Sequence, residues 1–283
     1  MTYCLGIVTK RGLVMASDSR TNSGADQVTT CRKMHTFVKP GERAFVMLTS
    51  GSLSATQSVL TLLRRDFDAG QGLAVAPTMY DAARVVGQQI RKVADLDREF
   101  LERDRFTFNV NIILGGQIAG EEPQLFLVYP QGNPLRATEE APYLQIGETK
   151  YGKPILDRGI RFDQTSLEEA CKYALLSLDS TMKSNVTVGP PVDLLVYEAG
   201  ELALTRHRKF AADDPDLMKI RLRWEQALRA AVQKLPQLRF RAGPVDGVLS
   251  ATKQETIELV EPQSSAEGAV EQVSQASQRQ PDK

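Results

Sequence analysis

Apolar and polar residues along the chain alternate between short β-type runs and longer stretches with helical spacing. Two β-branched, apolar runs at residues 2–9 and 12–17 are separated by a basic dipeptide and predict a hairpin at the start of the chain. A buried strand is expected at residues 43–49, followed by the small residues 50–52 and then by apolar positions three or four apart. We therefore predict a strand, a tight turn and a helix in this region.

The middle of the chain continues in the same way. Residues 78–103 place apolar side chains mostly three or four positions apart with charges between them, which predicts a long amphipathic helix. Further strands are expected at residues 106–118, 124–129, 143–146, 192–197 and 202–205, with helices ending near Arg158 and spanning 166–182, where Ser166 and Glu169 fit a capping box. Because the strands pair locally through hairpins, we expect an α+β fold in which two antiparallel sheets lie between helical layers, a four-layer αββα sandwich.

The last part of the chain differs in character. Residues 213–234 have apolar positions at helical spacing, with Pro215 near the start, and predict an additional amphipathic helix. Beyond residue 243 the sequence is polar and poor in core-forming residues, which is typical of a disordered segment. We expect one domain over residues 2–242, including the additional helix, and a polar tail over 243–283.

Composition narrows the functional classes. Lys and Arg total 35 and so do Asp and Glu, so the formal net charge is zero and no basic field attracts nucleic acid or an anionic membrane. No apolar run approaches the roughly 20 residues that span a bilayer, and the N-terminus lacks the pattern of a signal peptide. We therefore expect a cytoplasmic protein that binds neither nucleic acid nor membrane.

Cysteine and histidine are both scarce. Three widely spaced cysteines argue against a disulfide framework and against a zinc site. With only two histidines in 283 residues, most mechanisms that use a histidine as the base beside a serine or cysteine nucleophile are disfavoured. Any hydrolytic chemistry therefore has to use another base, and no metal is expected.

Thr2 offers such a base. It stands directly behind the initiator Met1, and removal of the methionine would expose a hydroxyl and a free α-amine on one residue. An α-amine has a pKa of about 7.7–8.0, so it acts as a general base at neutral pH without help from histidine. Threonine at position 2 is common, however, so the neighbouring residues decide how this position is interpreted.

Three further positions favour this chemistry. Asp18 closes the second strand of the hairpin, where antiparallel pairing brings it beside the start of the first strand. Lys33 is expected to begin the next strand and to bring an ammonium into the cluster, which lowers the pKa of the hydroxyl. The turn at Ser50-Gly51 offers backbone N–H groups for an oxyanion. The alternative is that Asp18 pairs with Arg20 in a turn and Lys33 is a solvated charge.

Together these residues resemble the proteasome-type N-terminal nucleophile hydrolases, and within them the bacterial ancestral β-subunit homologues called Anbu. The resemblance extends over about residues 2–210. It is carried by Thr2, Ser17-Asp18-Ser19-Arg20, Lys33, Thr49-Ser50-Gly51, the segment Ile146-Gly147-Glu148 through Leu156, and Leu178-Asp179-Ser180-Thr181 through Asn185 to Tyr197.

The resemblance implies a role for each matching residue. Thr2 would be the nucleophile and, through its amine, the base; Asp18 would orient it, Lys33 would lower its pKa, and the N–H of Gly51 would line the oxyanion hole. The positions matching the first specificity pocket are Thr21, Cys31, Thr49 and Leu53, and the supporting shell is Ser19, Arg20, Glu148, Asp179, Asn185 and Thr187.

The supporting shell is also where this sequence departs from the family pattern. Glu148 stands where the family has a serine, and Asn185 stands where it has the aspartate of an Asp-x-x-Ser element. Val188 takes the place of the serine of that element, unless Thr187 fills its role. The departures leave Thr2, Asp18 and Lys33 in place but alter the groups that handle protons.

The resemblance implies a threonine peptidase without a cofactor, acting on peptides or unfolded proteins inside a homo-oligomer that forms a ring or an open helical turn. Removal of Met1 alone would activate it, and any ATPase would be a separate protein. Two alternatives remain open: an N-terminal nucleophile amidase for a small molecule, and a catalytically weak assembly protein with the same fold.

Overall fold

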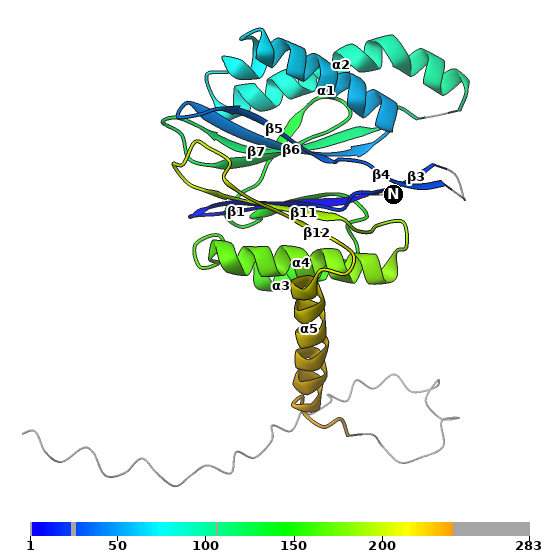
Figure 1. Cartoon of the computed structure of the whole chain (residues 1–283), viewed down its shortest axis with the longest axis vertical. Coiled ribbons are helices and arrows are strands. Elements are labelled where there is room, and N and C mark those ends of the chain that lie inside the picture. The colour runs from blue at the N-terminus through cyan, green and yellow to red at the C-terminus, as the bar shows by residue number, and fades with distance from the viewer. Residues whose placement is uncertain (1, 24–26, 106, 240–283) are drawn as a thin grey trace, which may run out of the picture. The chain divides into compact units, whose positions relative to one another are not determined.

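The computed structural model describes residues 2–23, 27–105 and 107–239. Its contacts divide the chain into two compact units, residues 1–224 and 225–283. In the first unit, two five-stranded sheets are stacked face to face, with α1 and α2 covering one sheet and α3 and α4 covering the other (Figure 1). The predicted αββα sandwich is confirmed.

Both large sheets are antiparallel. The first sheet has the strand order β10-β1-β2-β11-β12, the second has the order β5-β6-β7-β8-β9, and β3 and β4 form a separate two-stranded hairpin. The first sheet contains β1 (Tyr3–Thr9), β2 (Gly12–Ser17), β10 (Tyr143–Gly147), β11 (Val192–Glu198) and β12 (Arg206–Phe210). The second contains β5 (Met34–Lys39), β6 (Arg43–Gly51), β7 (Val110–Ile118), β8 (Gln124–Val128) and β9 (Pro134–Arg136), and the hairpin consists of β3 (Arg20–Ser23) and β4 (Gln27–Thr30).

The helices begin where the sequence provides caps. Thr78 accepts a hydrogen bond from the N–H of Asp81 at the start of α2, and Ser166 with Glu169 forms the predicted capping box of α4. The helical segments are α1 (Leu53–Asp68), the short 3₁₀ helix η1 (Gly72–Ala74), α2 (Met79–Arg103), α3 (Lys153–Gly159), α4 (Leu167–Ser184) and α5 (Pro215–Gln233). None of the helices in the described ranges is long and apolar enough to cross a membrane.

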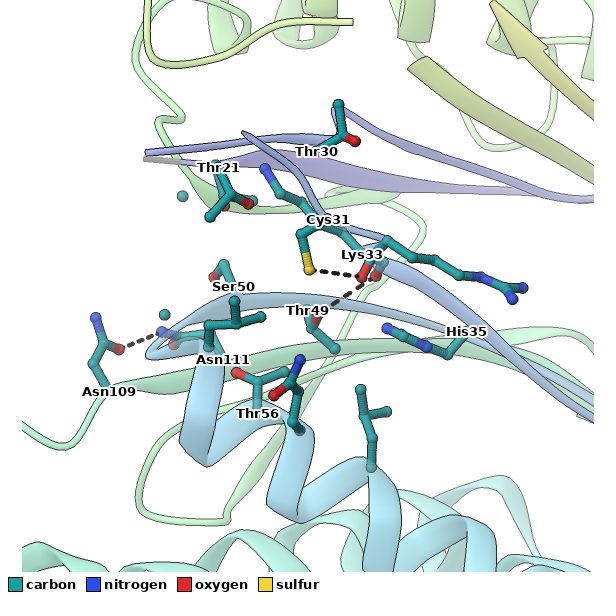
Figure 2. Close-up of a pocket in the computed structure, with 17 residues that line it drawn as sticks. Thr21, Thr30, Cys31, Lys33, His35, Thr49, Ser50, Thr56, Asn109 and Asn111 are labelled. Atoms are coloured by element: carbon teal, nitrogen blue, oxygen red, sulfur yellow. Dashed lines mark hydrogen bonds between the residues drawn. The ribbon is translucent and has the colours of Figure 1, made fainter. Parts of the chain in front are cut away.

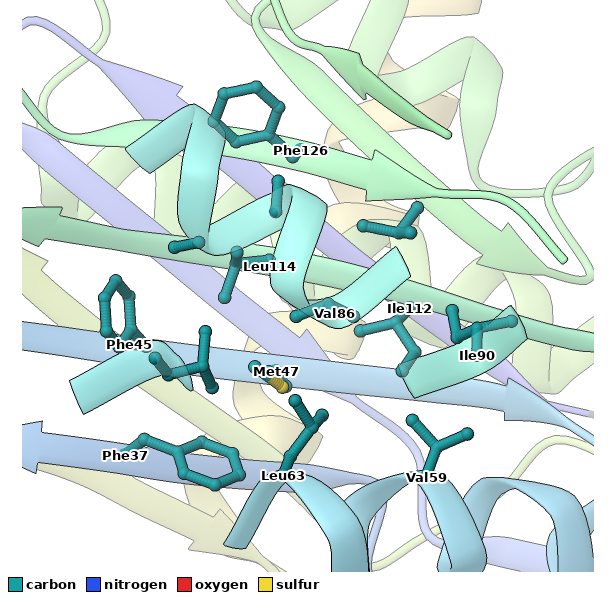
Figure 3. Close-up of a cluster of buried hydrophobic side chains, with 14 of the residues drawn as sticks. Phe37, Phe45, Met47, Val59, Leu63, Val86, Ile90, Ile112, Leu114 and Phe126 are labelled. Carbon is teal, nitrogen blue, oxygen red and sulfur yellow. The ribbon is translucent and has the colours of Figure 1, made fainter. Parts of the chain in front are cut away.

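Apolar side chains fill each gap between layers. Between the sheets, Met15 of β2 packs in one cluster with Leu48 of β6 and Ile113 of β7. Between the second sheet and its helices, Met47 and Ile112 face Val59, Leu63 and their neighbours from α1 and α2 (Figure 3). Burying each such side chain contributes about 1.5–3 kcal/mol, so these layers hold the strand ends in fixed positions.

The hairpin of β1 and β2 requires a glycine. Gly12 has a φ of +143°, and a Cβ there would lie 2.0 Å from the carbonyl oxygen of Tyr197 on β11. The close approach lets β2 pair with β1 on one side and with β11 on the other. As a result, Cys4 lies opposite Ser17, and the residue after Ser17 reaches the start of the chain.

The prediction of a strand at residues 202–205 is wrong, because β12 starts only at Arg206. The loop before it is held by hydrogen bonds to one side chain from each of the two large sheets. Gly200 N donates to Gln117 Oε1 at 2.7 Å, Leu202 N donates to the Tyr197 hydroxyl at 3.2 Å, and Leu202 has a φ of +45°. The strand expected from residue 106 begins only at Val110.

The end of the chain was predicted as a helix followed by a disordered tail. The described part contains α5 up to Gln233, and the first turns of this helix belong to the first unit, where Leu217 is buried against the α3 and α4 layer. The tail predicted at residues 243–283 lies outside the described residues.

Candidate active site

Thr2 lies at the end of an inner strand of the first sheet, directly before β1. Its carbonyl oxygen accepts a hydrogen bond from Glu148 N at 2.7 Å, at the end of β10. Gly147 has a φ of +87°, and a Cβ on it would lie 1.9 Å from the same carbonyl oxygen. The glycine therefore allows β10 to approach Thr2 closely and to fix its backbone.

Asp18 lies beside Thr2 because the hairpin register places it there. Its carboxylate is completely buried and accepts hydrogen bonds from the N–H groups of Tyr3 at 3.0 Å, Arg20 at 3.2 Å and Gly189 at 3.2 Å. The fourth donor is the Lys33 ammonium at 2.6 Å. Burial raises the pKa of Asp18, and the charge of Lys33 opposes this increase.

Lys33 immediately precedes β5 and is only 4% exposed. Its Nζ donates to Asp18 Oδ1 and to the carbonyl oxygen of Arg20, both at 2.6 Å. The alternative in which Lys33 is a solvated charge is therefore wrong, because burial and two short bonds hold the ammonium in one place. An ammonium fixed in this way lowers the pKa of a neighbouring hydroxyl through its charge.

A cavity of about 720 Å³ opens beside Thr2 (Figure 2). It lies between the start of α1, the β3–β4 hairpin and the edge of the second sheet, and Lys33 and Gly51 line it together with Thr2. The four pocket residues inferred from the sequence also line it: Thr21, Cys31, Thr49 and Leu53. A hydroxyl, an ammonium and a candidate oxyanion site therefore line the same substrate-sized cavity.

Gly51 ends β6 in a conformation that side chains rarely adopt. Its φ is +113°, and a Cβ would lie 2.0 Å from the carbonyl oxygen of Asn109. The turn from β6 into α1 therefore requires glycine, which places the backbone of Gly51 at the wall of the pocket.

We expect Gly51→Ala to lower the free energy of unfolding by about 2 kcal/mol or more, because it combines backbone strain with a backbone clash. Gly120→Ala is the matched control, since Gly120 has a φ of +88° but open space around its Cβ position. Urea denaturation of both variants measures the difference. Equal losses in the two variants would show that the contact with Asn109 is unimportant.

The groups that replace the family's supporting residues form one network. Asn185 Nδ2 donates to Glu148 Oε2 at 3.0 Å, and Thr187 Oγ1 donates to Asn185 Oδ1 at 2.6 Å. Lys150 lies 3.7 Å from the other carboxylate oxygen of Glu148. The N–H of Glu148 also donates to the carbonyl oxygen of Thr2. The network therefore connects Glu148 and Asn185, the positions that differ from the family pattern, to the backbone of the candidate nucleophile.

Ser19 and Arg20 hold the segment that follows Asp18. Ser19 Oγ donates to Asp193 Oδ2 at 3.3 Å, and Arg20 Nη1 donates to the carbonyl oxygen of Val186 at 2.5 Å. Asp193 in turn contacts His207 Nε2 at 3.0 Å. The Asp193–His207 pair was not predicted from the sequence, because the last strand was expected at residues 202–205, before His207.

The structure does not bring every expected residue into this cluster. Asp179 lies on α4 and pairs with Arg221 of α5 at 2.5 Å. Within the described ranges, its carboxylate makes no hydrogen bond to the residues around Thr2. The side chain of Val188 is buried in the core between the first sheet and its helices, so Thr187 supplies the hydroxyl that bonds to the Asn185 side chain in place of the missing serine.

His35 lines the same pocket and was not among the predicted site residues. Burial, together with the charges of Arg32 and Arg64, lowers the pKa of His35 from 6.5 to about 4. Its Nε2 is buried without a hydrogen-bond partner among the described residues. A single histidine in a run that mixes apolar and polar residues has no sequence pattern that would have identified it as a pocket residue.

The lowered pKa of His35 predicts an acid-sensitive contribution to stability. The folded protein disfavours the protonated ring, so the contribution is present above pH 6.5 and is lost as the pH falls towards about 4. It amounts to about 3 kcal/mol at most. We expect His35→Gln to flatten the pH dependence of the unfolding free energy over this interval, and identical slopes in wild type and variant would contradict the prediction.

Comparison with known proteins places these features in a family. The family model described as "Proteasome subunit" matches residues 2–197. The proteasome subunit beta of Haloferax volcanii is 25% identical over 214 residues, which cover 74% of this chain and 78% of that protein.

Solved structures agree with this result. Anbu, the ancestral beta-subunit from Yersinia bercovieri, has 42% identity and a TM-score of 0.79, covering 85% of this chain and 100% of that one. The Anbu complex from Pseudomonas aeruginosa, described as a helical assembly, has 43% identity and a TM-score of 0.78, covering 87% of this chain and 99% of that one. The chain belongs to the proteasome subunit family.

Proposed function

We propose that the protein is a threonine peptidase that cleaves peptide bonds by acyl transfer to Thr2 after Met1 has been removed. The observation that carries the proposal is the buried ion pair of Lys33 and Asp18, whose lysine lines the same pocket as Thr2. Burying two charges is unfavourable unless they are closely paired, and a pair at this position is suited to act on an adjacent hydroxyl. Family membership supports the same chemistry.

The proposed reaction has two steps. The Thr2 amine takes the hydroxyl proton, directly or through a water, while the Lys33 ammonium stabilises the developing alkoxide. The oxygen attacks the peptide carbonyl, the N–H of Gly51 donates to the oxyanion, and the proton passes to the leaving amine as the C–N bond breaks. Water then attacks the ester, and the carboxylic acid product and the Thr2 hydroxyl are released.

The network of Glu148, Asn185 and Thr187 is proposed to hold the α-amine and its water in place of the family's usual residues. A carboxylate near the amine favours its protonated form, so the base would be weaker at neutral pH than an isolated amine. We therefore expect low or substrate-restricted activity. The same replacement is the specific observation that favours the second candidate function, an assembly protein with a weak or vestigial site.

We further propose that the protein works as a homo-oligomer. The relative from Pseudomonas aeruginosa is described as a helical assembly, and open helical turns and closed rings both arise from repeating one head-to-tail contact. The substrates would be peptides or unfolded proteins, and any ATPase that delivers them would be a separate chain. Analytical ultracentrifugation and electron microscopy of the purified protein test the assembly.

The catalytic proposal is tested by intact-protein mass spectrometry before and after treatment with a peptide epoxyketone. This reagent forms its ring adduct only with an N-terminal residue that offers both a hydroxyl and a free amine. We expect a mass without Met1 and one adduct that maps to Thr2. Retention of Met1, or a free Thr2 that forms no adduct, would overturn the peptidase proposal and favour the assembly protein.

A further inference from the structure

We infer that the pocket beside Thr2 selects an acidic side chain, so that the substrates are peptides with a glutamate or aspartate next to the bond that is cleaved. The inference deepens the proposed function and rests on it for the position of that bond. It comes from the charges and hydrogen-bonding groups that line the cavity of about 720 Å³.

The first observation is the sign of the charges. The charged side chains of the described lining are Arg32 and Lys33, both cationic, and no carboxylate lines it. The charge of Lys33 is matched by Asp18 at 2.6 Å, whereas Arg32 forms no ion pair with any described residue. Arg32 Nε donates to the carbonyl oxygen of Met34 at 2.7 Å, which orients the guanidinium without neutralising it. The pocket therefore carries an excess of positive charge.

The second observation is the state of His35. Burial is the main cause of its lowered pKa, and the charges of Arg32 and Arg64 lower the pKa further. Arg64 itself donates to the carbonyl oxygen of Thr36 and lies over the ring of Phe37, so it has no carboxylate partner among the described residues. The region around His35 is therefore electropositive, which favours a bound carboxylate.

The remaining wall supplies neutral hydrogen-bonding groups. Most of these residues carry hydroxyls or amides, and Leu53 and Leu60 are the large apolar side chains among the described lining residues. The neutral polar residues are Thr21, Thr30, Thr49, Ser50, Thr56, Gln57, Asn109 and Asn111. Thr49, Thr56 and Asn111 already donate within the protein, to Lys33 O, Ser52 O and Asn109 Oδ1. The remaining hydroxyls and amides can donate to a carboxylate, whereas a lysine or arginine side chain finds no acid to pair with among the described lining residues.

The test measures binding separately from catalysis. The Thr2→Ala variant is titrated with three peptides that differ only at the residue before the bond to be cleaved, which is glutamate, glutamine or lysine. We expect the glutamate peptide to bind about five- to tenfold more tightly than the glutamine peptide, with the lysine peptide weakest. High salt should reduce the difference, because the pocket is open to solvent.

Arg32→Gln should remove the preference for glutamate over glutamine. Arg158→Gln is the matched control, because Arg158 lies on α3, caps the carbonyl oxygen of Pro154 and does not line the pocket. Equal binding of the three peptides, no measurable binding of any of them, or a glutamate preference that survives Arg32→Gln would each overturn the inference.

A parallel measurement with wild-type protein compares epoxyketones that carry glutamate or glutamine at the same position. Faster adduct formation with the glutamate reagent supports the inference and the proposed function together. If neither reagent modifies Thr2, the peptidase proposal fails, and the binding order in Thr2→Ala still decides the chemistry of the pocket.

Discussion

Replacing Thr2 with alanine is expected to abolish peptide cleavage while leaving the folded protein as stable as the wild type. The hydroxyl is the proposed nucleophile, and removing a nucleophile typically lowers turnover by about 10⁴-fold or more. The backbone of Thr2 stays in place, because Glu148 N holds its carbonyl oxygen and Gly147 allows the approach. Fluorogenic peptide assays and thermal unfolding measure the two expectations.

Thr2→Ser is the matched control for this prediction. Serine keeps the hydroxyl and is also small enough for Met1 to be removed, so the variant should form the epoxyketone adduct and retain part of the activity. Turnover by Thr2→Ala at the wild-type rate would place the chemistry elsewhere. A simultaneous loss of folding in both variants would show that the side chain of Thr2 has a structural role.

The position of Asp18 was predictable because it depends on local pairing. A hairpin with a short turn fixes which residues lie opposite each other, and the observed register places Cys4 opposite Ser17. Asp18, the next residue, then accepts from Tyr3 N. Sequence reasoning succeeded here because a few residues and one tight turn determine the geometry.

Lys33 was predictable for a related reason. It directly precedes an apolar run that becomes β5, so its place at the start of that strand follows from the hydrophobic pattern. Its bond to Asp18 nevertheless joins a residue at the edge of the second sheet to one at the end of a first-sheet strand. The sequence left open whether the ammonium joins Asp18 or is solvated, because periodicity within one strand does not show how two sheets are stacked.

The contacts that sequence reasoning missed connect distant parts of the chain. His207 reaches Asp193 only because β12 starts four residues later than expected, after a loop held by Tyr197 and Gln117. His35 lines the pocket because the second sheet presents it towards α1. These positions depend on side-chain contacts between layers, which hydrophobic periodicity does not encode.

Lys33→Met is expected to lower the free energy of unfolding by about 3 kcal/mol or more and to slow epoxyketone adduct formation at Thr2 by about 10²-fold. The stability loss arises because Asp18 stays buried without its cation. Lys172→Met is the matched control: it breaks an ion pair with Glu168 whose side chains are 58% and 80% exposed, and should cost about 0.5 kcal/mol at most.

The pH dependence of this loss identifies its cause. Burial already raises the pKa of Asp18 in the wild type, and removing the opposing charge of Lys33 raises it further. A carboxyl whose pKa is raised in the folded state destabilises the fold at pH values above that pKa and ceases to do so once it is protonated. The stability gap between Lys33→Met and wild type should therefore be widest at neutral pH and narrow in acid. A gap that does not change with pH would assign the loss to packing of the lysine stem rather than to the buried charge.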